Sequence, residues 1–356
     1  MPGRHGGNAI GFGRSSPALL SGRGRRGSRE VLMKRLIRSF AMAACVAAAA
    51  IGPAQAQSSE DTPELKSEYR FVMIPILAQA WFDIVHNAAA SSAEKLSKQL
   101  GTNITIDYQA PAQADLGEQN TLLERAIATN PDGIAIDAID VNASMPIIKE
   151  AQDRGIPIVL FVSTAPQGSQ LTYISNDFYD QGRILGEELL KRIDNKGKVA
   201  IMHGVPTNSA HADRYKALTD LFEKNADIEV VDTAYDMDDV QKAQTEASRI
   251  LAANPDLDAI AVVDAAGPVG VGLALREADR VGEVAYVGID DVPQLQQLMR
   301  EGVLDLSIAT RPRMIGEWST ITLLLQNLGI DTPSWIDTGI GYMTPDMVAE
   351  GNIDGF

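Results

Sequence analysis

The stretch TLLERAIATNPDGIAIDAIDVNASMPIIKEAQDRGIPIVLF, residues 121–161, predicts a helix, a tight turn, a buried strand, a second helix and a second strand. Apolar residues recur at helical spacing up to Ile127, and the turn sequence Asn-Pro-Asp-Gly at 130–133 ends the first helix. The short apolar run 134–136 is typical of a parallel strand that is covered on both faces. This order of elements favours an α/β fold.

The second half of the stretch completes a strand–helix–strand unit. We expect a helix over 146–154 that Gly155 ends, followed by a strand over the apolar run 156–161. Two parallel strands joined by a helix form a right-handed unit, and ligands of such sheets bind beyond the carboxyl ends of the strands. Here those ends are residues 137–140 and 162–164.

A second copy of the same pattern lies about 120 residues further along the chain. Residues 245–264, TEASRILAANPDLDAIAVVD, repeat the helix, the Asn-Pro-Asp turn and the buried strand, and GEVAYVGID at 282–290 takes the part of the following strand. That period is too long for a solenoid of stacked repeats. We therefore expect two similar α/β domains whose strand ends face each other across a cleft.

The N-terminal segment has the composition of an export signal. Residues 1–32 are rich in Gly, Arg and Ser and read as a disordered or mis-started leader. Residues 33–56 combine a basic start, a short apolar core and a small-x-small cleavage site at 54–56, which predicts a secretory signal cut before Gln57. An uncleaved N-terminal helix and a lipid on Cys45 are the alternatives.

Composition excludes several classes of function for the chain after cleavage. Residues 57–356 carry 22 basic and 46 acidic side chains, a net charge of −24, and such a surface repels nucleic-acid phosphates. No stretch of about 20 apolar residues predicts stable insertion in a membrane. The only cysteine, Cys45, lies in the signal, so neither disulfides nor thiolate chemistry are expected in the secreted chain.

Strands alternating with helices over residues 69–345 predict two doubly wound parallel-sheet lobes joined by a three-segment hinge. The hinge crossings are expected near 174–177, 310–312 and 338–343. In chain order the expected parts are the leader 1–32, the signal peptide 33–56, a linker 57–68, an N-terminal lobe of 69–174 plus 311–340, and a C-terminal lobe of 175–310 plus 341–356.

Patterns for catalysis are not found in the sequence. The secreted chain has His86, His203 and His211 but neither a zinc-binding HExxH motif nor a nucleophile-elbow GxSxG motif. The glycine-rich run 267–272 follows a strand, but its order is not the GxGxxG of a dinucleotide site, and we interpret it as a helix start with close packing. We therefore expect no enzyme activity, no metal and no cofactor.

The chain resembles the periplasmic substrate-binding proteins of the ribose/galactose-binding type, the receptors of sugar ABC importers. The resemblance covers residues 69–345 and is carried by Trp81-Phe82 after the first strand, the two Asn-Pro-Asp repeats, Ser175-Asn176-Asp177 and Val287-Gly288-Ile289-Asp290. It implies a type I periplasmic binding protein fold that closes over one small sugar-like ligand by a hinge motion.

The resemblance also implies where the ligand is held. The residues that match ligand-binding positions of the family, or that stand beside them at strand ends, are Gln79, Trp81, Phe82, Asp137, Ser163, Asp177, His211, Met237, Asp264, Asp290 and Thr310. Trp81 would stack on the apolar face of a sugar, or else be a core residue of its helix. Asp264 and Asp290 would accept hydrogen bonds from hydroxyls, or else cap the helices that follow them.

The sequence differs from the family at positions that usually form hydrogen bonds with the sugar. An Asp-Arg pair of the ribose-binding relatives is replaced by Val162 and Ser163, and a sugar-reading arginine falls on Ala212 while Arg214 matches a structural arginine. Because no neutral side chain reproduces the paired donors of arginine, we do not expect an ordinary pentose or hexose in the usual pose. Asp137, Asp140, Asn208, Ser209 and His211 are the groups expected to compensate.

Two functions are compatible with this sequence. The first is a monomeric periplasmic receptor that captures a sugar, polyol or related hydroxylated ligand and delivers it to the permease of an ABC importer. The second is a sensor that presents its closed form to a membrane chemoreceptor or kinase. Neither the ligand nor the permease is identified by the residues.

Overall fold

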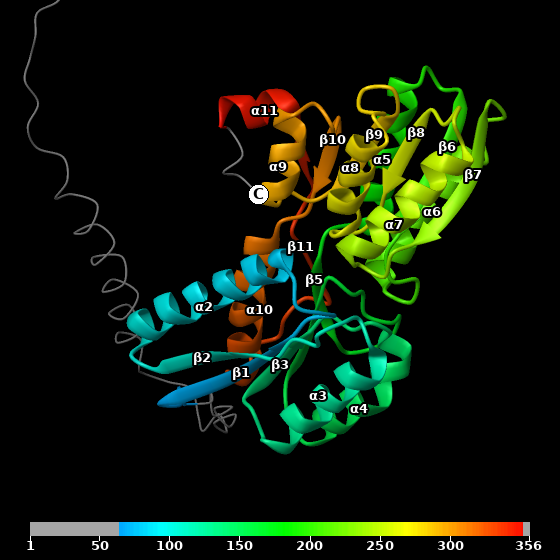
Figure 1. Ribbon diagram of the computed structural model, residues 1–356. Coiled ribbons are helices and arrows are strands. Elements are labelled where there is room, and N and C mark those ends of the chain that lie inside the picture. The colour runs from blue at the N-terminus through cyan, green and yellow to red at the C-terminus, as the bar shows by residue number, and fades with distance from the viewer. Residues whose placement is uncertain (1–63, 352–356) are drawn as a thin grey trace, which may run out of the picture. The chain divides into compact units, whose positions relative to one another are not determined.

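The computed structural model describes residues 64–351 (Figure 1). The leader 1–32, the signal peptide 33–56 and most of the linker 57–68 lie outside the described residues. Everything that is described belongs to one compact unit of the chain. Among these residues, none of the helices combines the length and the apolar character that crossing a bilayer requires.

The first sheet has the order β11-β5-β4-β3-β1-β2, and all of its strands run parallel. Its strands are β1 Glu68–Ile74, β2 Asn103–Tyr108, β3 Gly133–Ile136, β4 Ile158–Phe161, β5 Thr172–Ser175 and β11 Trp335–Asp337. Its helices are α2 Ala80–Leu100, α3 Leu116–Ala128, α4 Val141–Asp153 and α10 Pro312–Asn327. Alternate residues of β1 separate the two faces, because Phe71 packs with α2 residues such as Val85 while Val72 packs with Leu123 of α3.

The second sheet has the order β12-β10-β9-β8-β6-β7, with only β12 antiparallel to its neighbour. Its strands are β6 Gly197–His203, β7 Ile228–Tyr235, β8 Ala259–Val262, β9 Ala285–Ile289, β10 Leu306–Ala309 and β12 Gly341–Met343. Its helices are α5 Phe178–Arg192, α6 Ser209–Phe222, α7 Val240–Ala253, α8 Gly267–Glu277, α9 Pro293–Arg300 and α11 Pro345–Glu350. Helices α5 and α6 cover one face, and α7, α8 and α9 cover the other.

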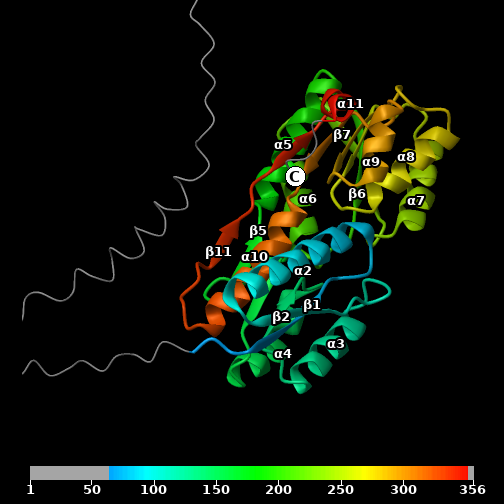
Figure 2. The same cartoon turned by 90° about the vertical axis from the view of Figure 1, so that its left-hand side faces the viewer.

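The chain passes between the two sheets three times. It leaves the first sheet after Ser175 at the end of β5, returns after Ala309 at the end of β10, and leaves again between β11 and β12. The return brings α10 against α2, and Figure 2 shows the two helices side by side over the first sheet. An N-terminal and a late C-terminal segment therefore complete the same layer.

The predicted α/β fold of two parallel-sheet lobes is confirmed, and the repeated Asn-Pro-Asp segments do precede the equivalent strands β3 and β8. One predicted helix start is wrong. The helix expected over 146–154 begins at Val141, because the side chain of Asp140 accepts a hydrogen bond from the amide of Ala143 at 3.0 Å and caps it. Pro146 lies inside this helix and costs it one backbone hydrogen bond.

Glycine at position 316 is required by the packing of α10 against α2. A Cβ atom on Gly316 would lie 2.1 Å from the carbonyl oxygen of Val85 and 2.9 Å from the amide of Ala89. Backbone atoms cannot yield as a flexible side chain can, so the two helices would have to separate. This close contact holds α10 against α2 in the N-terminal lobe.

Replacing Gly316 by alanine should lower the free energy of unfolding by about 1–3 kcal/mol, as overpacking of a tight interface does. The matched control is Gly117→Ala in the exposed first turn of α3, where a Cβ would meet only the Oδ1 of the exposed Asp115 side chain, at 3.3 Å. Because that side chain can move and alanine favours helix, the change there should stay within about 1 kcal/mol of neutral. Urea denaturation of both variants measures the difference. Equal effects at the two sites would contradict the packing argument.

Candidate functional site

Side chains from both sheets converge on one small cavity beyond the carboxyl ends of their strands. The first sheet contributes the segments that follow β1, β3 and β4, and the second contributes α6 and the segments that follow β7, β8 and β9. The lining residues are Ile76, Gln79, Trp81, Phe82, Asp137, Val162, His211, Arg214, Asp238, Ala265 and Asp290. The cavity has a volume of about 20 Å³. We call this cavity the central pocket, and it is where parallel sheets place ligands.

Hydrogen bonds join the two sheets around the central pocket. Five of them involve side chains. Gln79 Nε2 donates to Asp238 Oδ2 at 2.7 Å, and Trp81 Nε1 donates to Thr310 Oγ1 at 3.1 Å. Asn208 Nδ2 donates to Asp137 Oδ1 at 3.1 Å and to the Ala138 carbonyl at 3.4 Å, and the Thr164 amide donates to Ser209 Oγ at 2.8 Å. Each bond pairs a residue of the first sheet's lobe with one of the second's. The facing surfaces are therefore complementary in this conformation.

Aromatic rings form the apolar wall of the central pocket. Trp81 and Phe82 open α2 and lie edge to face with their ring centroids 5.0 Å apart. Phe82 also meets Phe161 at the end of β4, with a centroid distance of 6.4 Å. Trp81 is buried with the core of α2, yet it lines the pocket and its indole N–H reaches Thr310. Trp81 is thus both a core residue of its helix and part of the pocket's lining, and its stacking on a ligand stays a prediction.

The backbone is strained at three residues that line the pocket. Val162, Asp238 and Asp290 have φ angles of 62°, 60° and 75°, in the left-handed region that side chains with a Cβ rarely adopt. For β-branched Val162 this conformation is a marked outlier. Such strain costs of order 1–3 kcal/mol per residue and concentrates at functional sites. Each of these residues follows a strand, so the strain turns the chain sharply at the pocket's rim.

Three carboxyl groups form a buried cluster behind one side of the pocket. The Ala266 amide bonds to both Asp238 Oδ1 and Asp264 Oδ2, and the Asp238 amide bonds to Asp236 Oδ1. Asp236 Oδ2 and Asp264 Oδ1 are buried and have no hydrogen-bond partner. Burial, together with the neighbouring carboxylates, raises the pKa of Asp236 and of Asp264 well above the ordinary range. The cluster therefore retains a proton to a higher pH than an exposed aspartate does.

Asp137 and Asp290 bring two further carboxyl groups to the pocket. Asp137 Oδ1 accepts the amide of Asn208, but its Oδ2 is buried and has no partner. Asp290 Oδ1 accepts the hydroxyl of Thr310. Burial raises the pKa of both aspartates, while the nearby Arg214 opposes the shift at Asp290.

The basic side chains at the pocket are largely committed to the protein. Arg214 donates from Nε to Gln181 at 2.8 Å and from Nη1 to the carbonyl of Val263 at 3.0 Å, and its guanidinium lies over the ring of Phe178. His211 Nδ1 accepts the Val205 amide at 2.9 Å, so this nitrogen carries no proton. Burial holds the pKa of His211 well below its usual range, which keeps the ring neutral.

The structure brings most of the predicted ligand-binding residues together. Six of them line the central pocket: Gln79, Trp81, Phe82, Asp137, His211 and Asp290. Thr310 stands directly beside it, bonded to both Trp81 and Asp290. Asp290 caps no helix, because α9 begins after Val292 without a side-chain cap.

The other four predicted residues do not line the central pocket. Asp264 lies one layer behind Asp238 and accepts the amides of Ala266 and Gly267, which is the helix-capping alternative. Ser163 Oγ accepts the amide of Ala138, the exposed Asp177 caps α5 by accepting the amide of Asp180, and the half-buried Met237 packs against the hydrophobic core.

Sequence reasoning missed Asp238 and gave Arg214 only a structural role. Asp238 lies in the run Asp236-Met237-Asp238-Asp239 that follows β7, so the rule of strand ends that selected Asp264 and Asp290 also applied here. The left-handed turn at Met237 and Asp238 aims the Asp238 side chain at Gln79. Aspartate tolerates this conformation, but the run does not indicate which of its residues adopt it. Arg214 is buried in the middle of α6 and reaches the pocket from there.

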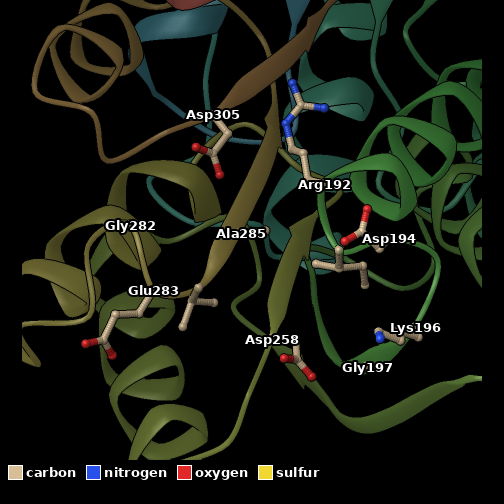
Figure 3. Close-up of a pocket in the computed structure, with 11 residues that line it drawn as sticks. Arg192, Asp194, Lys196, Gly197, Asp258, Gly282, Glu283, Ala285 and Asp305 are labelled. Atoms are coloured by element: carbon tan, nitrogen blue, oxygen red, sulfur yellow. The ribbon is translucent and has the colours of Figure 1, made fainter.

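A larger cavity of about 650 Å³ lies at the opposite, N-terminal edge of the second sheet (Figure 3). Charged side chains of both signs line it, among them Arg192, Asp194, Lys196, Asp258 and Glu283. It is formed by residues of the second sheet's lobe alone and lies away from the carboxyl ends of the strands. Among residues 64–351, no group of three or more His, Cys, Asp or Glu side chains is arranged to hold a metal ion.

Comparison with known proteins gives a consistent result. The family model for the periplasmic binding protein domain matches residues 71–328. The D-ribose/D-allose-binding protein of Pseudomonas aeruginosa is 26% identical over 281 residues, covering 77% of this chain and 85% of the relative. The D-allose-binding periplasmic protein of Escherichia coli is 26% identical over 259 residues, covering 70% and 81%. The solved structure of a sugar-binding protein of a sugar ABC transporter from Bacillus halodurans is 29% identical, with a TM-score of 0.67, and the match covers 79% of this chain and 99% of that one.

The carboxyl cluster should make stability depend on pH in an unusual direction. A carboxyl group with a raised pKa in the folded state binds its proton more tightly there than in the unfolded chain. Its contribution to stability therefore falls as pH rises from about 4 through the folded-state pKa, by up to about 1.4 kcal/mol per pH unit. Asp264→Asn removes this dependence and keeps an oxygen for the amides of Ala266 and Gly267.

We expect Asp264→Asn to match the parent near pH 4.5 and to be more stable by at least about 1 kcal/mol at pH 7.5. Chemical denaturation across this pH range measures it. Asp115→Asn, which changes an exposed helix cap, is the control and should run parallel to the parent. A constant offset between Asp264→Asn and the parent at every pH would show that the cluster holds no extra proton.

Proposed function

This chain belongs to the periplasmic binding protein domain family, and from that premise we propose that it is the solute receptor of an ABC importer. Its relatives are transport receptors rather than enzymes. We propose that it captures a small hydroxylated ligand, a sugar, polyol or related compound, in the central pocket. The observation that carries the proposal is the convergence of polar side chains from both sheets on one pocket beyond the strand ends. A permease is the partner that the receptor role requires, and a monomer suffices for it.

Ligand entry would require the two lobes to separate. Pockets for small molecules usually span about 300–1,000 Å³, whereas the central pocket has about 20 Å³ and is bridged by the bond from Gln79 to Asp238. The three connections after β5, after β10 and between β11 and β12 are the proposed hinge. We divide the chain there into an N-terminal lobe of 69–174 plus 311–340 and a C-terminal lobe of 175–310 plus 341–356.

The proposed ligand contacts follow from the pocket's lining. Asp137, Asp238 and Asp290 would accept hydrogen bonds from the ligand, and Gln79 would donate once its bond to Asp238 is exchanged. Trp81 and Phe82 would cover an apolar face, as aromatic rings do for the C–H faces of sugars. His211 and Thr310 complete the polar set, while Ser163, Asp177, Met237 and Asp264 would support the loops that carry it.

The site of action is proposed to be the periplasm. The family supports this assignment, and the composition of residues 33–56 supports export through a cleaved signal. A second use of the fold would be to present the same closed form to a chemoreceptor. The described residues contain no feature specific to that function.

Removing the pocket's contacts should weaken ligand binding. Losing one charge-assisted hydrogen bond, worth about 1.5–3 kcal/mol, should make Asp290→Ala bind about tenfold to a hundredfold more weakly, and Trp81→Ala should lose affinity through its missing ring. Calorimetry with a hydroxylated ligand selected by thermal-shift screening, beginning with D-ribose and D-allose, measures this. The exposed Asp115→Ala is the control. Folded variants that bind like the parent would place the site elsewhere.

Closure itself should be visible in solution. Both lobes contribute contacts to the pocket, so ligand binding favours the closed state and should reduce the radius of gyration. Small-angle scattering with and without saturating ligand tests the hinge. An unchanged radius at saturation would argue against closure around the ligand.

Export should remove residues 33–56 with everything before them. The basic start, apolar core and Ala54-Gln55-Ala56 predict a secreted chain that begins at Gln57. N-terminal sequencing and intact mass of periplasmic protein measure this. A chain that keeps residue 50, or one with a lipid on Cys45, would be the contradicting result.

A further inference from the structure

The central pocket is lined by more acidic than basic side chains. Three aspartates line it, Asp137, Asp238 and Asp290, and Arg214 is the one lysine or arginine among the residues that line it. His211 adds no charge because burial keeps it neutral. Burial raises the pKa of all three lining aspartates, because a carboxylate closed off from water without a cationic partner is costly. A neutral ligand would not supply that partner.

Arg214 does not offset the three aspartates by direct pairing. Two of its nitrogens are bonded to Gln181 and to the carbonyl of Val263, and its guanidinium stacks over Phe178. Among the described residues, no ion pair within 4.0 Å links Arg214 to an aspartate of the pocket. Its charge acts on Asp290 through space.

The carboxylate oxygens of the pocket have fewer protein donors than they can accept. Asp238 uses Gln79 and the Ala266 amide, and Asp290 uses the Thr310 hydroxyl. Asp137 is only 1% exposed, and its Oδ2 has no hydrogen-bond partner although the side chain lines the pocket. An unpartnered buried carboxylate oxygen is costly. It marks the place where a donor from a ligand belongs.

The aromatic wall is suited to a cation as well as to a sugar face. Trp81 and Phe82 line the pocket together with these aspartates. Aromatic faces attract ammonium groups, most strongly at tryptophan and when the site is dry. A protonated amine also provides three N–H donors, all of which suit carboxylate acceptors.

We propose that the ligand of the central pocket is a small polyhydroxylated compound that carries a protonated primary amine, such as an amino sugar or an aminopolyol, with its ammonium group against Asp137. The proposal rests on the receptor function above and specifies the chemical class of its ligand. Hydroxyls of the same compound would occupy Asp290, Gln79 and His211. Acidic sugars would be repelled by the three aspartates.

The test compares matched pairs of compounds that differ only in the amine. We would measure binding at pH 7 by calorimetry for D-glucosamine against D-glucose and N-acetyl-D-glucosamine, for 1-amino-1-deoxy-D-sorbitol against D-sorbitol, and for scyllo-inosamine against scyllo-inositol. In at least one set the free amine should bind tenfold or more tightly than its neutral partners. Neutral compounds that bind as tightly as their amines, or more tightly, would overturn the proposal and leave the receptor function intact.

Two further arms distinguish a polyhydroxylated amine from a bound metal ion and from a simple diamine. Calcium chloride alone should not stabilise the protein against heat, and stabilisation by calcium equal to that by the amines would overturn the proposal in favour of a metal ion. Putrescine, a diamine without hydroxyls, should bind more weakly than the best amino sugar, and the reverse order would overturn the polyhydroxylated class. If none of the amines binds while a neutral compound from the thermal-shift screen does, this inference fails and the receptor function stands.

Charge at a single position provides the sharpest comparison. Asp137→Asn keeps an oxygen for the Asn208 amide but removes the carboxylate, and it should weaken the binding of the amine at least tenfold while affecting its neutral partner less than twofold. The control is Asp153→Asn, an exposed aspartate of α4. Equal losses for amine and neutral partner in Asp137→Asn would show that Asp137 acts by shape alone and would overturn the proposal.

Discussion

Carboxyl groups buried between the two sheets impose the constraint on which the arrangement of this site depends. An aspartate taken out of water needs donors, a proton or an opposite charge. The molecule meets part of this need locally: Asn208 reaches Asp137 from the other lobe, Gln79 does the same for Asp238, and the amides of Ala266 and Gly267 bond to Asp264. Two of the side-chain hydrogen bonds that join the lobes are thus also bonds that satisfy these acids. Closure and the chemistry of the pocket therefore share interactions.

The fold could be predicted from the sequence because its signals are local and repeated. The Asn-Pro-Asp turns, the short apolar runs and their alternation with helices identify parallel strands one by one, and the strand-end rule places Asp137 and Asp290 at the pocket. The position of Asp238 could not be predicted by that rule alone, because Asp238 reaches the pocket through a left-handed turn after β7. The start of α4 was also predicted wrongly. The prediction placed it at Pro146, whereas the side chain of Asp140 caps the helix and the helix begins at Val141.

The remaining parts of the site depend on contacts that no local pattern contains. Arg214 lies in mid-helix, and its bonds to Gln181 and Val263 hold it where it lines the pocket. The left-handed backbone of Val162 at the pocket's rim is visible only in three dimensions. Asp264 caps α8 and also belongs to the acid cluster. A strand-end aspartate can therefore serve the helix that follows it and the site at the same time.

Helix α10 has a consequence for the order in which the chain can fold. It packs on α2 through Gly316, although more than two hundred residues separate the two helices in sequence. The lobe that is synthesised first therefore cannot complete its hydrophobic layer until the ribosome has passed residue 327, and β11 follows later still. Contacts between such distant segments form slowly. Until then the surfaces of α2 and β3 that α10 covers stay exposed on the emerging chain.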